Sequence, residues 1–245
     1  MKRRALIITP TGTNMFFDDL YDKNNHWRMR KPEADYDVCV VAFKDDFEPE
    51  PGTYDMIVRK KGLKWRLIPE IAKVIKWEDY DYIGCWDDDY CTDIQSVNAS
   101  LALARQYDFR IFQQSLTSWT VFPCLENRKD VVFTETNFLE FGVPFFRNDI
   151  FHKVLEFLND YKYEKSDWGI DKVICYYLQA SAHVIHSTSI KHMRRESSYD
   201  HQDGFREMHY LMTEFFPKYM KEKYGVEYKY TDQQVVISEA RMKND

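Results

Sequence analysis

The chain has 245 residues, of which 44% are hydrophobic and 16% aromatic, and its 40 acidic side chains outnumber its 34 basic ones. This apolar content excludes an intrinsically disordered chain, and no apolar run approaches the roughly 18 residues that a membrane-spanning helix needs. A net charge of −6 argues against a nucleic-acid partner, because binding to a phosphate backbone needs a basic face.

Spacing of apolar residues predicts the elements in chain order. In the first half we expect strands at 4–9, 36–43, 54–59 and 80–86, helices at 63–76 and 94–106, and a strand at 109–114. The second half predicts strands at 131–134, 138–146, 182–187 and within 226–237, and helices at 149–160, 168–180 and 203–222. Alternating strands and helices indicate an α/β fold, with a mostly parallel sheet flanked by helices.

No stretch rich in Pro, Gly or Ser divides the chain, so we expect one domain over 1–245 rather than two small ones. Residues 1–110 would form a nucleotide-binding half, 111–200 an acceptor half, and 201–245 a C-terminal helix and tail. The number of cysteines, five, is odd and no C-x-x-C pair occurs, which favours free thiols in a reducing compartment. The apolar stretch Ala5 to Ile8 is too short for a signal peptide. We therefore expect a cytoplasmic protein.

Three adjacent carboxylates, Asp87, Asp88 and Asp89, directly follow the apolar strand 80–86. In open α/β sheets, ligands bind beyond the carboxyl ends of the strands. If the chain stays extended there, Asp87 and Asp89 point to one side and Asp88 to the other. The pair would bind Mn²⁺ or Mg²⁺, and Asp88 would accept a hydrogen bond from a ribose.

A bound cation would stabilise a diphosphate leaving group as a Lewis acid, which is what transfer from a nucleotide sugar requires. The alternative is a solvated acidic loop or a cap for the helix near residue 94. Adjacent carboxylates repel one another unless something neutralises them, and these follow a buried strand. We therefore favour the metal site.

The run 80–90, YDYIGCWDDDY, resembles the core of a GT-A-type glycosyltransferase-like family of bacterial and plant domains, whose plant members are often labelled lysine-ketoglutarate-reductase trans-splicing related. Five further pieces agree in order: KGLKW (61–65), QQSLTSWT (113–120), TNFLEFGVPFF (136–146), SDWGID (166–171) and IKHMR (190–194). The sequence departs from the family at Trp86 and Gln114, where prolines are usual.

The resemblance implies a GT-A-like fold and transfer of a sugar from a nucleoside-diphosphate sugar to a carbohydrate or other hydroxyl acceptor. It matches Asp87 and Asp89 to the metal-associated positions of the family. Asp171 matches the aspartate of its Trp-Gly-x-Asp motif, and His192 matches a histidine that follows the next strand.

The SDWGID segment has two readings. Ser166 or Asp167 would cap a helix beginning near Trp168, with Asp171 in its first turn. Alternatively, Asp171 or Asp167, four residues apart and so on one helical face, would be the base that removes a proton from the acceptor hydroxyl.

The histidines near residue 190 differ in their surroundings. His192 lies in a basic stretch that includes Arg194 and would complete the metal shell as the stretch closes over a diphosphate. His183 and His186, on a predicted strand, are more typical of structural histidines. For Arg194 and Arg195, a solvated charged face is an equal alternative.

Near the N-terminus, Thr9, Thr11 and Gly12 end the first strand, where a base or ribose would bind unless this is an ordinary turn. Lys64 would reach a phosphate or else lie on the surface at the start of a helix. Glu140, inside an apolar run, is a candidate for the acceptor site or an outward residue of an edge strand.

Two other functions remain open. A nucleotidyltransferase also uses acidic metal ligands, but a Gly-rich phosphate loop is normally present near its first strand, and only Gly12 occurs here. A non-catalytic sugar-binding module would keep the fold for recognition. Trp119 and Trp168 are candidates for stacking on sugar faces, although tryptophans are more often core residues.

Overall fold

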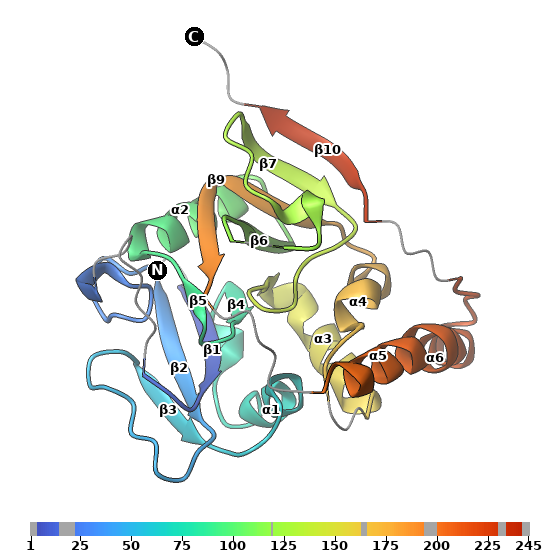
Figure 1. The fold of residues 1–245 in the computed structure, drawn as a ribbon, viewed down its shortest axis with the longest axis horizontal. Coiled ribbons are helices and arrows are strands. Elements are labelled where there is room, and N and C mark those ends of the chain that lie inside the picture. Colours follow the sequence, from blue (N-terminus) through green and yellow to red (C-terminus); the bar gives the residue numbers. More distant parts are fainter. Residues whose placement is uncertain are drawn as a thin grey trace.

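The structure is a computed structural model that describes residues 4–14, 23–118, 120–162, 166–193, 200–229 and 234–241. Within these residues, ten strands form one mixed sheet in the order β10-β7-β9-β6-β8-β4-β1-β2-β3, with the short β5 pairing to β9 outside this path (Figure 1). This mixed central sheet flanked by helices confirms the fold class predicted from the sequence.

The described strands have these bounds: β1 (Ala5–Thr11), β2 (Tyr36–Ala42), β3 (Met56–Arg59), β4 (Tyr82–Cys85), β5 (Tyr90–Cys91), β6 (Ile111–Leu116), β7 (Val131–Thr136), β8 (Phe145–Arg147), β9 (Ala182–His192) and β10 (Val236–Arg241). The α-helices are α1 (Lys64–Ile71), α2 (Ile94–Gln106), α3 (Asn148–Asp160), α4 (Ile170–Leu178), α5 (His201–Tyr210) and α6 (Phe216–Tyr224).

The parallel part of the sheet fixes where a ligand can bind. Strand β1 pairs in parallel with β2 and β4, and β6 pairs in parallel with β9. Strand β8 lies antiparallel between β4 and β6, so β4 and β6 run in the same direction. The carboxyl ends of β1, β4, β6 and β9 therefore lie at one edge of the sheet, where open α/β folds bind ligands.

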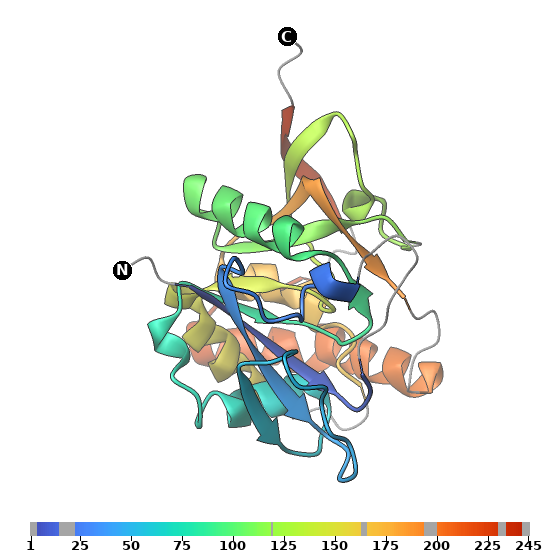
Figure 2. The same cartoon turned by 90° about the vertical axis from the view of Figure 1, so that its left-hand side faces the viewer.

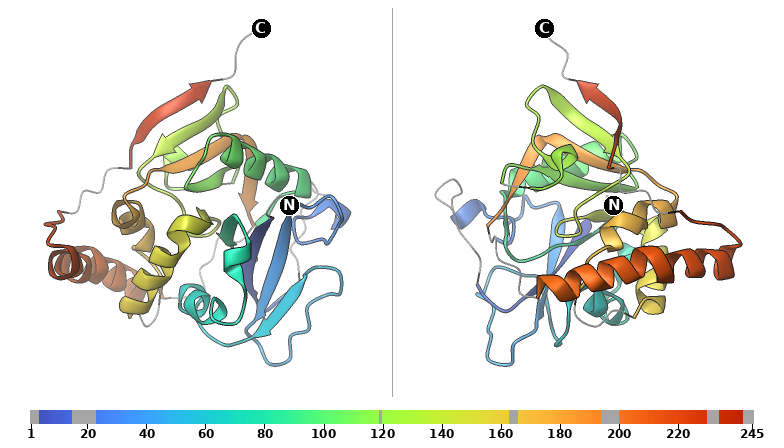
Figure 3. Two further views of the ribbon diagram at one scale, coloured as in Figure 1. Left: turned by 180° about the vertical axis from the view of Figure 1, so that it is seen from behind. Right: turned by 45° about the vertical axis from the view of Figure 1, so that its right-hand side comes forward.

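Side chains on the two faces of the sheet form two separate cores. Leu6, Ile8 and Ile83 face one core, which α1, α3, α4 and the C-terminal helices cover. Ala5 and Ile7 face the other, which α2 covers. Figures 2 and 3 show α2 on one side of the sheet and the other helices on the opposite side. Both faces of the central strands are thus buried, which explains their continuous apolar sequences.

The strand predicted at 138–146 is largely wrong. Only Phe145–Arg147 is a strand, and the preceding residues form a buried irregular segment. Phe138 and Leu139 point into opposite cores, as neighbouring residues of a strand would, so the apolar pattern imitates a strand. Pro144 cannot donate a ladder hydrogen bond, so the contact with β4 continues only through the carbonyl oxygens of Pro144 and Gly142, which accept from the amides of Cys85 and Asp87 at 3.0 and 2.8 Å.

Two helices and the C-terminal strand also differ from expectation. Helix α1 ends at Ile71 instead of 76, and it contains Pro69, which removes one backbone hydrogen bond. The predicted helix 203–222 is present, with a one-turn π-helical segment, Leu211–Phe215, between α5 and α6. Strand β10 begins at Val236, so the described residues 226–229 and 234–235 of the predicted strand are not in one.

The cysteines are all free, as predicted. In the part of the chain that the structure describes, no helix is both long and apolar enough to cross a membrane.

Candidate functional site

Four strands bring distant parts of the sequence to the carboxyl edge of the sheet. Strand β1 ends at Thr11, β4 leads into the acidic triplet, and β9 ends at His192. The short β5 was not predicted, and it pairs antiparallel with the end of β9, so that Tyr90 lies opposite His192 (Figure 1). The structure thus places the triplet and His192, which are about one hundred residues apart, side by side.

The triplet lies in a turn and is not extended as expected. Strand β4 ends at Cys85, and Asp88 and Asp89 form the turn that leads into β5. Each carboxylate consequently faces a different partner: Asp87 pairs with Lys64, Asp88 lies beside Thr11, and Asp89 lies beside His192. These contacts therefore decide which way each carboxylate points, and not the side-chain alternation of an extended strand.

Lys64 is a buried site residue and not the surface lysine that the sequence left as an alternative. Its Nζ lies 2.8 Å from Asp87 Oδ1 and donates to the carbonyl oxygen of Phe141 at 2.6 Å, and its side chain is only 7% exposed. The Asp87 side chain keeps 42% of its surface exposed. Desolvation by the packed protein around its carboxyl still raises the pKa of Asp87 to about 7. Lys64 opposes this shift, and the charges of Asp89 and Asp167 add to it.

We expect Lys64→Met to lower the free energy of unfolding by about 1.5–3 kcal/mol at pH 8, because it removes two hydrogen bonds of a charged donor. The loss should lie toward the lower end, since water screens the half-exposed Asp87. Urea denaturation measures the change. Adding Asp87→Asn should recover part of the loss, because the neutral amide needs no cation. Equal stability of wild type and Lys64→Met would contradict the pairing.

Asp88 is directed toward the end of β1. The Thr11 hydroxyl lies 2.5 Å from Asp88 Oδ2 and 2.7 Å from the carbonyl oxygen of Thr13. Thr9 is fully buried, and its hydroxyl has no hydrogen-bond partner among the described residues. Gly12 follows in a bend where an added Cβ would meet Phe43 at 2.7 Å. Of the predicted ribose-side residues, Thr11 thus contacts Asp88 directly, and Gly12 follows it in the chain.

Arg28 is a charged residue near Asp88 that sequence reasoning missed. It is fully buried, and within the described ranges none of its guanidinium nitrogens has a hydrogen-bond partner. Burial lowers the pKa of Arg28 to about 10, opposed by the charges of Asp88 and Glu50. A buried guanidinium without acceptors is costly, so this position favours a ligand with acceptor oxygens. Nothing in the sequence around Arg28 distinguishes it from an ordinary loop arginine.

Asp89 and His192 are the two predicted metal ligands that the structure brings into contact, with Nε2 of His192 lying 3.3 Å from Oδ2 of Asp89. The Tyr90 ring stacks on the imidazole at 4.4 Å and 5°. Burial alone would lower the pKa of His192, but the Asp89 carboxylate and the charges of Glu140 and Asp87 raise it. Sequence reasoning missed Tyr90, which fixes the plane of the imidazole.

Among the residues that the structure describes, no group of three or more His, Cys, Asp and Glu side chains is arranged to hold a metal ion. Asp89 and His192 supply one oxygen and one nitrogen, which fits a cation that takes its remaining ligands from substrate phosphates and water. Asp87 already has a cationic partner in Lys64. The metal itself stays a prediction.

Asp167 and Asp171 lie near the entrance of α4 but not on one helical face. The helix begins at Ile170, and its N-cap is Gly169 with φ +95°, so neither Ser166 nor Asp167 caps it. The capping prediction is wrong because the chain reaches the helix through a left-handed glycine. Asp171 lies in the first turn, as expected.

The two carboxylates share an environment that disfavours charge. Desolvation raises the pKa of Asp171 to about 7, with Lys172 opposing and Asp167 and Glu140 adding to the shift. Desolvation likewise raises the pKa of Asp167 above its ordinary value, opposed by Lys64. Carboxylates with raised pKa values in a polar site are typical of general bases, so both keep their predicted role as candidates.

Other predicted residues have structural roles or lie outside the described ranges. His186 uses both ring nitrogens, accepting from the Arg128 amide at 3.2 Å and contacting the Thr134 hydroxyl at 3.0 Å. His183 stacks on Phe109 at 3.8 Å. Both agree with the structural alternative. Trp168 packs against Phe205 of α5. The other predicted residues, Arg194, Arg195 and Trp119, lie outside the described residues.

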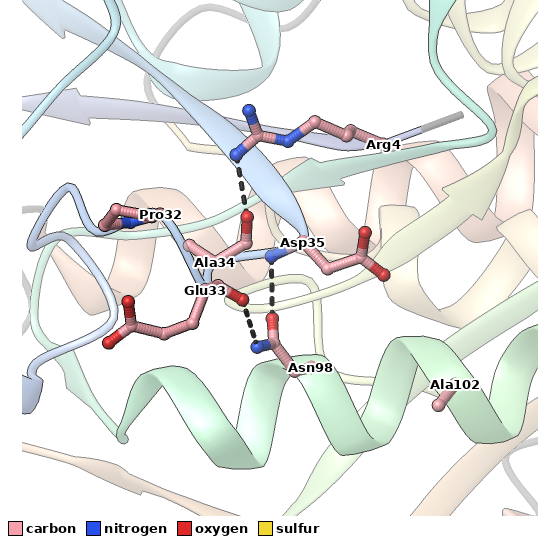
Figure 4. A pocket seen from close by; sticks show the side chains of 7 residues that line it. All are labelled: Arg4, Pro32, Glu33, Ala34, Asp35, Asn98 and Ala102. Atoms are coloured by element: carbon pink, nitrogen blue, oxygen red, sulfur yellow. Dashed lines mark hydrogen bonds between the residues drawn. The ribbon is translucent and has the colours of Figure 1, made fainter. Parts of the chain in front are cut away.

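A groove of about 540 Å³ lies at the opposite, amino edge of the strands, between Arg4, the loop before β2 and helix α2. Figure 4 shows Asn98 of α2 bonded to the backbone of Glu33 and Asp35, at 2.8 and 2.9 Å, and Arg4 bonded to the carbonyl oxygen of Ala34. These polar groups serve to join the loop to α2, so this groove is not the candidate site.

No family model matches the sequence, and no curated protein matches it. In fold, the chain is similar to TarS of S. aureus. The crystal structure of TarS 1–349 in complex with UDP-GlcNAc aligns with a TM-score of 0.52 at 10% identity, covering 87% of this chain and 66% of the TarS chain. The complex with UDP gives a TM-score of 0.51 at 7% identity, covering 87% and 65%.

The chain therefore spans slightly less than two thirds of the TarS chains that it matches. The likeness confirms that the chain has a glycosyltransferase-like fold, as the sequence predicted. The narrower resemblance to a bacterial and plant family stays a prediction, since no family model matches.

Proposed function

We propose that the chain is a metal-dependent glycosyltransferase that moves a sugar from a nucleoside-diphosphate donor to a carbohydrate or other hydroxyl acceptor. The observation that carries the proposal is the gathering of the acidic triplet, His192 and Asp171 at the carboxyl edge of a TarS-like sheet. The TarS structures are complexes with UDP-GlcNAc and UDP, which supports a nucleotide sugar as the donor.

Each side chain has a role in this proposal. Asp88, beside Thr11 and Arg28, would bind the nucleoside through its ribose. Asp89 and His192 would hold the cation. A divalent cation, Mn²⁺ or Mg²⁺, would stabilise the charge that develops on the departing diphosphate.

Lys64 has one further hydrogen for a phosphate oxygen, because an ammonium carries three donors and two already point at protein oxygens. Asp171, with Asp167 as the alternative, would accept the proton of the acceptor hydroxyl. In this proposal the cationic groups bind the diphosphate, which gains negative charge, and a base of raised pKa lies on the acceptor side.

Release of nucleoside diphosphate from a panel of UDP- and GDP-sugars, with Mn²⁺ and without added acceptor, tests the proposal. We expect slow release from at least one donor, with water as acceptor, and none in the presence of a chelator. Binding of glycans without any nucleotide binding would instead indicate a non-catalytic sugar-binding module.

A further inference from the structure

Glu140 lies in the site, and the proposed function assigns it no role. Its Oε1 accepts a hydrogen bond from the Tyr90 hydroxyl at 2.7 Å, and its backbone N–H donates to Oε1 of Gln113 at 2.6 Å. Its other carboxylate oxygen, Oε2, is buried and has no hydrogen-bond partner among the described residues. A carboxylate oxygen left in this state costs free energy that a donor group on a ligand would recover.

The segment around Glu140 is tied to the predicted metal side of the site at several points. The Phe141 carbonyl oxygen accepts from Lys64, and the Gly142 carbonyl oxygen accepts from the Asp87 amide at 2.8 Å. Gly142 also has to be glycine, because an added Cβ would lie 2.4 Å from the Tyr90 hydroxyl. Tyr90 in turn stacks on His192. Glu140 is therefore held in place relative to Asp87 and His192.

Glu140 also lies toward the base candidates. The charges of His192, Lys64 and Asp89 act on Glu140, and Glu140 in turn acts on Asp171. Glu140 is therefore near enough to feel the side chains assigned to the diphosphate and to act on the one assigned to the acceptor proton. In a sugar transfer the transferred sugar has to bind near both, because its anomeric carbon exchanges the diphosphate for the acceptor oxygen.

We propose that Glu140 binds a hydroxyl of the donor's transferred sugar and sets the specificity for that sugar. The inference rests on the proposed function, and it differs from the acceptor role that the sequence suggested. A phosphate carries only acceptors and a negative charge, so the free carboxylate oxygen would repel it. A sugar hydroxyl donates a hydrogen bond and is uncharged, and it matches Oε2.

The test compares UDP and UDP-sugars on Glu140→Gln. Calorimetry with Mn²⁺ measures the affinity for UDP, and UDP release without acceptor measures kcat/KM for each UDP-sugar. We expect the affinity for UDP to be unchanged and kcat/KM for the preferred UDP-sugar to fall by about 10- to 100-fold, because a charged acceptor has become a neutral amide. The ranking among UDP-sugars should change as well. Glu126→Gln, the same change at an exposed position, is the matched control.

Equal losses for UDP and UDP-sugar, or unchanged kcat/KM and ranking, would overturn the inference while leaving the proposed function standing. A wild-type protein that binds neither UDP nor GDP and releases neither from any sugar would overturn both. If Glu140→Gln does not fold, Tyr90→Phe carries the test, because it removes the hydroxyl that orients the carboxylate. That variant should also keep its affinity for UDP and lose kcat/KM for the UDP-sugar, and an unchanged kcat/KM would overturn the inference.

Discussion

Asp89→Asn is expected to lower the rate of nucleotide release from a UDP-sugar by about 10²- to 10³-fold, because it removes charge that stabilises the leaving group in the transition state. Asparagine has the same shape as aspartate, and the Asp89 backbone carbonyl would still accept from the Met193 amide at 2.8 Å. The fold should therefore persist, with an unchanged midpoint of urea denaturation. Release of UDP, followed by a coupled assay at saturating Mn²⁺, measures the effect.

Asp149→Asn is the control for this variant, since Asp149 lies at the start of α3 beyond β8, at the opposite edge of the sheet. It should release UDP at the wild-type rate. Undiminished release by Asp89→Asn would contradict the assignment of Asp89 to the metal.

Asp171→Asn is expected to reduce transfer by about 10²- to 10⁴-fold and to change its dependence on pH. A base has to be deprotonated, and the pKa of Asp171 is raised to about 7 by desolvation and by its neighbours Asp167 and Glu140, against Lys172. The wild-type rate should therefore fall as pH drops below about 7. The variant should lose this dependence, and rates between pH 5 and 9 measure it.

The raised pKa of Asp171 also affects the stability of the fold, and the direction of this effect follows from the direction of the shift. Because the pKa of Asp171 is higher in the folded chain than in the unfolded one, the folded state holds more protons between about pH 4 and 7. This group therefore lowers stability as pH rises through that window. Asp171→Asn should raise the melting temperature at pH 8 and change it less at pH 4, which separates a folded, inactive variant from a misfolded one.

Asp167→Asn is the matched comparison, because its pKa is raised by the same kind of desolvation. If Asp167→Asn loses the dependence on pH and Asp171→Asn keeps it, the base is Asp167, and our assignment of Asp171 is wrong.

The parts of the fold that were predicted correctly are those that local sequence determines. The apolar runs of β2 and β4 are buried on both faces, so each reads as a strand without knowledge of its neighbours. The acidic triplet could be placed at an edge because it directly follows such a run. The resemblance added Asp171 and His192, and the structure brings both to that same edge.

The contacts that make up the site could not be predicted, because they join residues far apart in the chain. Tyr90 and Glu140 are 50 positions apart, and Asp89 and His192 are 103 apart. No local pattern reports such pairs. The prediction for the segment before β8 failed for the opposite reason. Its local pattern is that of a strand, but its backbone bonds to the end of β4 and the chain after it only through the carbonyl oxygens of Gly142 and Pro144.

Binding of UDP measured by calorimetry with and without Mn²⁺, on wild type and Asp89→Asn, tests the central claim most directly. If Asp89 and His192 hold a cation that binds the diphosphate, Mn²⁺ should tighten UDP binding to the wild type by roughly 10- to 100-fold and leave its binding to Asp89→Asn unchanged. Equal affinity of the wild type for UDP with Mn²⁺ and with a chelator would contradict the account.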